Sequence, residues 1–163
     1  MLRSRGWIIA TVMGMLSAGP AFAANLTVQV EGVLSASGNV RVGLYDAPRY
    51  PNNANKPLLA AEAPAMAGET IVILRDVPPG IYAVQLFQDI NANGRMDTSW
   101  IGLPLEPFGF SQDATPFISK PSFDQVKFTL LPGENRLVIH LQNSIKSSPT
   151  EKARDAIRAR QRK

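Results

Sequence analysis

Short segments in which apolar and polar residues alternate run through much of this chain. In residues 25–33 (NLTVQVEGV), Leu26, Val28 and Val30 alternate with polar residues, and residues 39–46 (NVRVGLYD) repeat the pattern. A period of two is typical of a strand with one buried and one solvated face. Turn residues such as SASGN and PPG separate the segments, and we find no long amphipathic helix pattern. The pattern predicts an all-β fold.

Four further segments are expected to be strands. They are residues 69–77 (ETIVILRDV), 81–89 (IYAVQLFQD), 123–131 (FDQVKFTLL) and 135–142 (NRLVIHLQ). The PGE turn between the last two predicts a hairpin, with Leu137, Ile139 and Leu141 facing inward. Tyr82 and Val84 should point to the same side of their strand. The whole set predicts an antiparallel β-sandwich of about seven strands, immunoglobulin-like or transthyretin-like.

Two long connections interrupt the strands. The first, residues 47–68, is rich in Pro, Asn and Ala and is expected to cross the surface with a short helical turn near Leu58–Ala63. The second, residues 91–121, contains the segment IGLPLEPFGFS. Connections of this length without regular structure are usually functional or disordered, so the second connection is where we expect a site.

The N-terminal residues have the three parts of a secretory signal peptide. Arg3 and Arg5 precede an apolar run over residues 7–16, and residues 21–23 (AFA) form a small-x-small cleavage site. The run is too short to span a bilayer. We therefore expect cleavage of residues 1–23 and a periplasmic or secreted protein without a transmembrane segment. The chain has no cysteine, which excludes disulfides and a cysteine-linked lipid.

The charge is unevenly distributed along the chain. Residues 144–163 carry seven basic and two acidic side chains, a net of +5, whereas residues 24–143 carry eight basic and eleven acidic ones, a net of −3. The predicted domain, residues 24–143, is thus mildly acidic, and its charge does not indicate a nucleic-acid binder. The basic tail is either frayed or attaches to an envelope polysaccharide or another anionic surface.

The segment QDINANGRMD, residues 88–97, has the spacing of a calcium-binding loop. Calcium loops place oxygen ligands at positions one, three, five, seven and nine, and a glycine at position six allows the sharp turn. Numbered from Asp89, position six is Gly94. The candidate ligands are the side chains of Asp89, Asn91, Asn93 and Asp97 and the backbone carbonyl of Arg95.

The match to a calcium loop is incomplete. Position twelve is Trp100 instead of the bidentate glutamate, and only Asp89 and Asp97 carry charge, so any site would be weak. Glu106 is a candidate further ligand from the following segment. The alternative is a turn in which Asp and Asn side chains bind nearby backbone N–H groups. Both interpretations stay open from the sequence.

No catalytic constellation emerges from the sequence. The one histidine, His140, is expected to face solvent on the last strand, and no G-x-S-x-G elbow is present. Aromatic residues in the second connection either anchor that connection in the core or line a ligand surface. These residues are Trp100, Phe108, Phe110 and Phe117.

A family resemblance rests on four motifs. Residues 76–111 contain G-x-Y-A, D-x-N-x-N-G-x-x-D and I-G-x-P-x-E-x-x-G-F-S, and residues 38–45 contain G-x-V-x-V-x-L-Y. The chain resembles the exported bacterial family called domain of unknown function 2141 over about residues 26–141. Members often have a histidine before the loop's first aspartate, where this chain has Gln88. The resemblance implies an architecture and a candidate site, but it implies no reaction.

We therefore expect a non-enzymatic binding or structural module of the bacterial envelope, with a candidate Ca²⁺ loop at residues 89–97. One alternative is a carbohydrate- or peptide-binding module that uses residues 100–110. The other is a hydrolase in which the carboxylates of Asp89, Asp97 and Glu106 do acid–base work.

Overall fold

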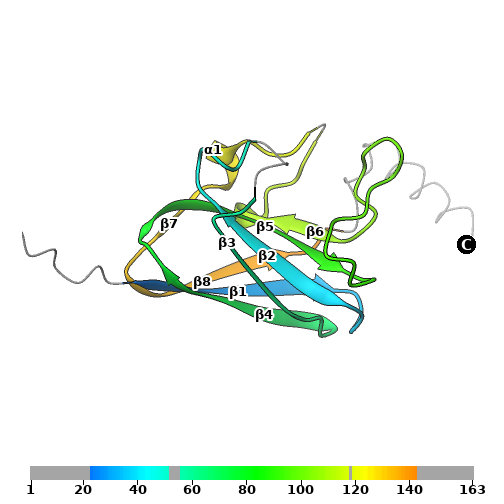
Figure 1. Cartoon of the computed structure of the whole chain (residues 1–163), viewed down its shortest axis with the longest axis horizontal. Coiled ribbons are helices and arrows are strands. Elements are labelled where there is room, and N and C mark those ends of the chain that lie inside the picture. Colours follow the sequence, from blue (N-terminus) through cyan, green and yellow to red (C-terminus); the bar gives the residue numbers. More distant parts are fainter. Residues whose placement is uncertain (1–22, 52–55, 118, 143–163) are drawn as a thin grey trace, which may run out of the picture.

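The computed structural model describes residues 23–51, 56–117 and 119–142, which form two open β-sheets packed face to face (Figure 1). The basic tail and almost all of the predicted signal peptide lie outside the described residues. The all-β prediction is confirmed for the described residues, whose helical elements are one four-residue α-helix and one short 3-10 turn.

The first sheet has three strands in the order β4-β1-β8. They are β1 (Ala24–Val33), β4 (Gly68–Val77) and β8 (Gly133–His140). β1 pairs with β4 in the antiparallel direction but with β8 in the parallel direction. The expectation of a wholly antiparallel sandwich is therefore wrong for this pair. β1 and β8 are the first and last strands in the sequence, and no hairpin joins them.

The second sheet has the order β3-β2-β5-β6, and β7 also pairs with the first residues of β5. The strands are β2 (Asn39–Tyr45), β3 (Leu59–Pro64), β5 (Gly80–Asp89), β6 (Phe108–Phe110) and β7 (Phe128–Leu130). A 3-10 turn, η1 (Ser111–Asp113), and the helix α1 (Phe123–Val126) lie between β6 and β7.

The main core fills the space between the two sheets. The predicted inward faces are buried, and Leu137 and Leu141 pack against the same core. Burying apolar area is the main force that holds such layers together. The buried residues confirmed from the alternation are Leu26, Val28, Val30, Val40, Val42, Leu44, Tyr82, Val84 and Ile139.

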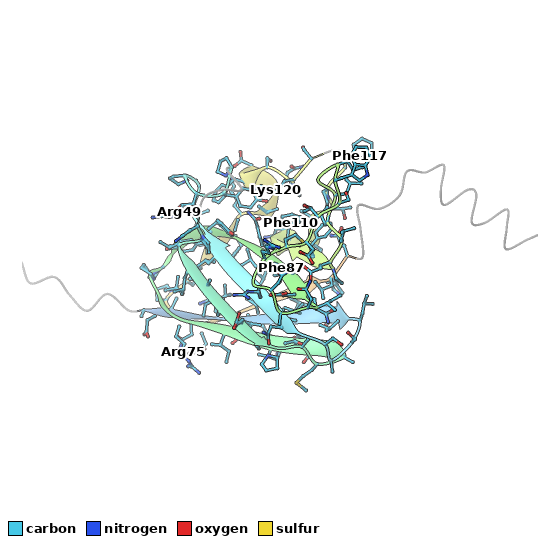
Figure 2. The ribbon with its side chains drawn as sticks, turned by 45° about the vertical axis from the view of Figure 1, so that its right-hand side comes forward. Arg49, Arg75, Phe87, Phe110, Phe117 and Lys120 are labelled. Carbon is cyan, nitrogen blue, oxygen red and sulfur yellow. The ribbon has the colours of Figure 1, made fainter. Side chains whose placement is uncertain are left out.

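A second apolar cluster covers the outer face of the five-stranded sheet. Tyr50 comes from the first long connection and Val126 from α1, and both pack with Ala83 from β5 and with Phe108 and Phe110 from β6. Phe87 is partly buried and packs against the same cluster (Figure 2). The first long connection is therefore part of a covering layer, together with α1, and does not simply wander over the surface.

Three local predictions are wrong. Leu58–Ala63, expected as a helical turn, contributes to strand β3, which pairs with β2 from Leu44↔Leu59 to Asn39↔Pro64. Pairing with a neighbouring strand overrides the helical preference of its alanines.

The predicted hairpin around the PGE turn is also absent from the described structure. β7 pairs with β5, whereas β8 pairs with β1, so this turn carries the chain from one sheet to the other. Residues 123–126, expected as strand, form α1, where the side-chain Oε1 of Gln125 accepts the N–H of Ser122 at 2.8 Å. Such a contact stabilises a helix N-terminus.

The turn between β4 and β5 also crosses from one sheet to the other. At this crossing the hydroxyl of Tyr82 donates a hydrogen bond to the carbonyl oxygen of Pro78, with the two oxygens 2.9 Å apart. A tyrosine whose hydroxyl binds the main chain a few residues upstream, at a corner between the two sheets, is a recurring feature of immunoglobulin-type sandwiches.

Candidate functional site

The loop that follows β5 leaves the sandwich beside the turn between β1 and β2. The register pairs Asn39 with Asp89, and an added Cβ at Gly38 would lie 1.8 Å from the carbonyl oxygen of Asp89. Gly38 also has a φ of +69°. Only glycine therefore allows this close approach, which sets the position at which the loop begins.

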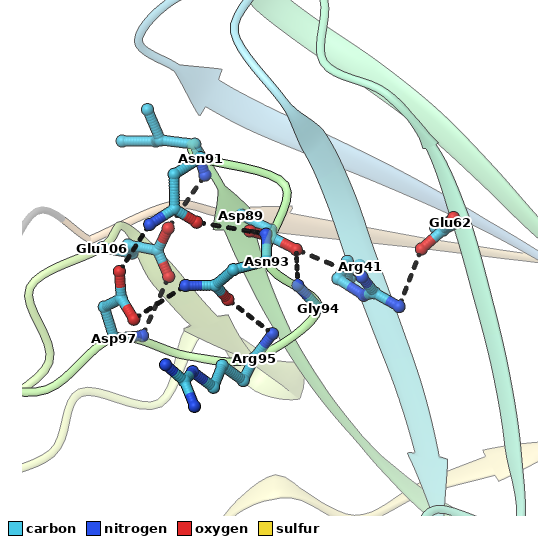
Figure 3. A network of polar contacts seen from close by, with 10 residues as sticks. Arg41, Glu62, Asp89, Asn91, Asn93, Gly94, Arg95, Asp97 and Glu106 are labelled. Atoms are coloured by element: carbon cyan, nitrogen blue, oxygen red, sulfur yellow. Dashed lines mark hydrogen bonds and ion pairs between the residues drawn. The ribbon is translucent and has the colours of Figure 1, made fainter.

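Asp89 is the buried centre of the loop (Figure 3). Its Oδ1 accepts the N–H of Asn93 at 3.0 Å, and its Oδ2 accepts the N–H of Gly94 at 2.8 Å and Nη1 of Arg41 at 3.1 Å. Burial alone would raise the pKa of Asp89, but the hydrogen bonds from Gly94, Arg41 and Asn93 together hold this pKa below its ordinary value. Asp89 is therefore a carboxylate held in its charged form.

Glu106 fastens the far end of the same loop. Its side chain is 5% exposed, and its Oε1 accepts the N–H of Ile90 at 2.9 Å while its Oε2 accepts the N–H of Asp97 at 3.0 Å. One carboxylate thus joins the beginning and the end of the loop. The loop and the segment that carries Glu106 therefore form one unit (Figure 3).

The remaining loop side chains satisfy one another. Asp97 accepts the amide groups of Asn91 at 2.7 Å and Asn93 at 2.9 Å. The side-chain oxygen of Asn91 accepts the N–H of Asn93, and that of Asn93 accepts the N–H of Arg95 at 2.9 Å. The structure therefore gathers all six candidate residues, with Arg95 taking part through its N–H.

This donor set fits a self-satisfied turn better than it fits a calcium ion. In a calcium loop the oxygens converge on one point, whereas here the oxygens of Asp89, Asn91, Asn93 and Glu106 all accept N–H groups. Among the described residues no group of three or more His, Cys, Asp or Glu side chains is placed to hold a metal. Calcium binding at this loop stays a prediction.

A hairpin-like tip extends between Asp97 and Glu106. Thr98 and Pro104 form a bridge, the N–H of Ser99 donates to the carbonyl of Leu103 at 2.8 Å, and the N–H of Gly102 returns to Ser99 at 2.9 Å. The side-chain oxygen of Ser99 accepts the N–H of Leu103 at 3.1 Å. These bonds define the conformation of the tip.

Apolar side chains on this tip face solvent. Trp100 is 96% exposed, and Ile101, Leu103 and Leu105 are exposed beside it in sequence. We call residues 100–105 the apolar tip. Gly102 and Pro104 complete it, so the tip has no charged side chain.

The aromatic residues of this connection divide into two groups. Phe108 and Phe110 are buried in the outer cluster and anchor the connection, as one alternative predicts. Trp100 and Phe117 are exposed, and Figure 2 shows Phe117 at the margin of the molecule, away from the body. The exposed pair matches the other alternative, a surface available to a ligand.

The contacts of three residues in the site were not predicted from the sequence. These residues are Arg41, Gly38 and Gln88, whose buried amide Nε2 donates to the carbonyls of Ser35 at 3.0 Å and Ser37 at 3.1 Å. Through these bonds Gln88 ties β5 to the β1–β2 turn. The only local sequence signal for these contacts is a glycine, Gly38, in the turn that follows an alternating segment.

The predicted exposure of His140 is confirmed, but its ring is not merely solvated. Its Nδ1 lies 2.7 Å from Oδ2 of Asp113, and its Nε2 lies 3.1 Å from Oε2 of Glu31. The hydrogen bond and the charge of Asp113 are the main causes that raise the pKa of His140; burial opposes them, and Glu31 adds to the rise. The histidine links η1 to β1 and has no nucleophile among these contacts.

Residues 28–138, about two thirds of the chain, match the family described as an uncharacterised protein conserved in bacteria, DUF2141. The chain belongs to DUF2141. The match runs from Val28 within β1 to Val138 within β8 and includes the loop centred on Asp89 and the apolar tip. No curated protein and no solved structure matches the chain. Within the part of this DUF2141 chain that the structure describes, no helix has the length and apolar character needed to cross a bilayer.

Proposed function

We propose that this protein is an exported, non-enzymatic binding module of the bacterial envelope, and that the apolar tip is its contact surface. The observation that carries the proposal is the 96% exposure of Trp100 on a hydrogen-bonded turn. A contiguous run of exposed apolar side chains is costly in water and marks an interaction site in a native protein.

The base of the tip suits this role. Glu106 and Asp89 fasten the loop to the sandwich through bonds to Ile90, Asp97 and Gly94. A preorganised contact loop loses less conformational entropy on binding than a mobile one. The buried carboxylates thus act as supports for the contact surface.

The same burial argues against the hydrolase alternative. Asp89 is fully buried under N–H donors, and both oxygens of Glu106 are occupied by backbone N–H groups. An acid–base pair for glycoside hydrolysis needs two carboxylates that face a substrate. Of the three carboxylates considered, only Asp97 is partly exposed.

We further propose that the sandwich is of the immunoglobulin-like group. The hydrogen bond from Tyr82 to Pro78 at the corner between the sheets supports this assignment. Two observations would agree with it. Tyr82→Phe should unfold at a lower denaturant concentration than the parent, and an experimental structure should have the same strand order. A strand order different from β4-β1-β8 and β3-β2-β5-β6 would not.

In-cell photo-crosslinking tests the proposed contact surface. A photoreactive phenylalanine analogue is placed at position 100 and, as a matched control, at position 131, because Leu131 is also exposed but lies beyond the other end of β5. We expect envelope adducts from position 100 and few from position 131. N-terminal sequencing of the same material should begin at Ala24. Equal or absent adducts at the two positions would overturn the contact surface.

A further inference from the structure

Strand β4 has one uncovered edge. The three-stranded sheet has the order β4-β1-β8, so β1 covers one side of β4, and no other strand of the described chain covers the second side. The turn and loop hydrogen bonds of the described residues also leave this edge without a backbone partner. Figure 1 shows β4 along the lower margin of the domain. Such an edge presents a row of free N–H and C=O groups with which a further strand can pair.

The other edge strands are protected in ways that β4 is not. β6 and β7 have only three residues each, and β3 has six and ends at Pro64. The end of β8 is covered by η1, where Asp113 accepts the N–H of His140 at 2.8 Å. β4 has ten residues and contains neither proline nor lysine. Because native proteins blunt exposed edges with short strands, proline or lysine, the uncovered edge of β4 indicates a partner.

The exposed side chains of β4 form a row that is complementary to itself. Four exposed residues alternate with buried ones along the strand, in the order Glu69, Ile71, Ile73 and Arg75. The row ends before Asp76, whose φ of +57° marks an irregularity in the pairing with β1. Val72 is the midpoint of the row. A twofold axis at Val72 therefore sets the negative end of one copy opposite the positive end of another.

Two antiparallel copies of β4 around that axis place Glu69 opposite Arg75 and Ile71 opposite Ile73. Opposite charges and β-branched side chains that face each other directly stabilise an antiparallel pair. Ile71 and Ile73 are 40% and 41% exposed, so both have apolar area to bury. Glu69 uses Oε2 for the amide of Gln29, which leaves Oε1 for a guanidinium. Arg75 makes no ion pair with another described residue, and Figure 2 shows it pointing away from the body.

We propose that two copies of this protein associate through β4, in the antiparallel direction and around a twofold axis at Val72, so that their three-stranded sheets form one continuous sheet. Each residue pair then occurs twice, as in any twofold interface. The closed pair uses the uncovered edge of both copies and leaves none for growth into fibres. This proposal is independent of the proposed function, because the apolar tip belongs to the connection between β5 and β6 of the other sheet.

Sedimentation velocity of the purified protein tests the association. An interface built on one strand pair is small, so concentrations up to about 1 mM are needed to observe a weak dimer. Arg75→Glu should weaken the dimer about tenfold, because like charges then face each other at both ends of the pair. Glu69→Arg should do the same for the same reason. The double variant Glu69→Arg, Arg75→Glu restores opposite charges and should dimerise like the parent.

Two further measurements separate this interface from general effects. Glu134→Arg makes the same change of charge at an exposed position of β8 and should leave the dimer unchanged. The chain has no cysteine, so Ile71→Cys and Ile73→Cys can each be oxidised alone or after mixing. We expect disulfide-linked dimers mainly from the mixture, because identical positions lie diagonally across the pair and beyond the reach of a disulfide. Circular dichroism should match the parent, since the changed side chains are exposed.

Four outcomes would overturn the proposal. The first is a monomer at every concentration, and the second is a dimer that the double variant fails to restore. The third is a dimer that Glu134→Arg weakens as much as Glu69→Arg does. The fourth is a monomer whose β4 instead captures a strand of a different protein, which would make that protein the occupant. None of these results alters the adducts expected from position 100, so the proposed function stands or fails by its own test.

Discussion

The guanidinium of Arg41 on β2 donates a hydrogen bond to the buried carboxylate of Asp89 at the end of β5, with Nη1 and Oδ2 3.1 Å apart. The other side of the guanidinium pairs with Glu62 on β3, where Nη2 and Oε2 are 3.0 Å apart. Arg41 therefore joins the loop to two neighbouring strands, one contact buried and the other exposed.

This difference in burial predicts different costs for the two partners of Arg41. Asp89→Ala should lower the free energy of unfolding by about 3–5 kcal/mol, because it leaves buried donors without an acceptor. Glu62→Ala removes a partner on the exposed side and should cost at most about 1 kcal/mol. Urea denaturation measures both, and equal losses would contradict the assigned role of Asp89.

The lowered pKa of Asp89 predicts a specific loss of stability in acid. A carboxylate whose folded-state pKa lies below its unfolded value of 3.8 stabilises the fold above that value. This contribution is lost as the pH falls through the lower folded-state pKa. The difference in unfolding free energy between the parent and Asp89→Asn should be constant near neutral pH and shrink below about pH 4. A difference that grows in acid would have the wrong sign.

Glu106→Gln tests the clamp across the loop. A glutamine offers one acceptor oxygen to the two N–H groups of Ile90 and Asp97, so we expect a loss of about 1–3 kcal/mol. Amide hydrogen exchange should accelerate at Ile90 and Asp97. Glu134→Gln changes an exposed carboxylate that contacts Asn25 and serves as the control. Unchanged protection at Ile90 would show that Glu106 is not the clamp.

Calcium can be tested on the same loop. Because its oxygens already accept N–H groups, we expect equal melting temperatures with about 1 mM calcium and with a chelator, the range in which weak extracellular sites bind. A calcium-dependent rise that disappears in Asp97→Asn would instead establish a metal site. Magnesium at the same concentration controls for a general effect of divalent ions.

His140 predicts a loss of stability toward alkaline pH. A histidine whose folded-state pKa is raised above 6.5 stabilises the fold fully below that value, and the contribution is lost as the pH rises through the raised pKa. His140→Gln keeps the backbone N–H bond to Asp113 and should differ from the parent below pH 6.5 but converge with it in base. Asp113→Asn should flatten the same profile. A parent profile without this slope would contradict the pairing.

The alternation of apolar and polar residues was sufficient to predict the strands that have one buried face. Val28 and Val40 face the core because each strand has one buried side, a property that the sequence displays directly. Strand β3 has no such signal, since most of LAAEAP is exposed and small, and it is a strand only because β2 pairs with it. The parallel pairing of β1 with β8 is equally non-local and leaves no trace in either segment.

The sequence predicted which residues form the candidate site more fully than it predicted what their side-chain oxygens contact. Spacing brings Asp89 and Asp97 into one loop, and the motif adds Glu106. Spacing does not show whether oxygens face one another or the backbone, and here they face N–H groups. Arg41, separated from Asp89 by 48 residues in sequence, could be assigned only once the register of β2 and β5 was known.

The parallel pairing of β1 and β8 also determines how the domain responds to mechanical force. Ala24 pairs with Gly133 and Glu31 with His140, so the start of β1 and the end of β8 lie at opposite ends of this strand pair (Figure 1). Tension applied between these ends would load the hydrogen bonds of the pair together, in shear, and not unzip them one after another. Forced extension is governed by the rate of unfolding, and we expect a pair loaded in shear to slow that unfolding.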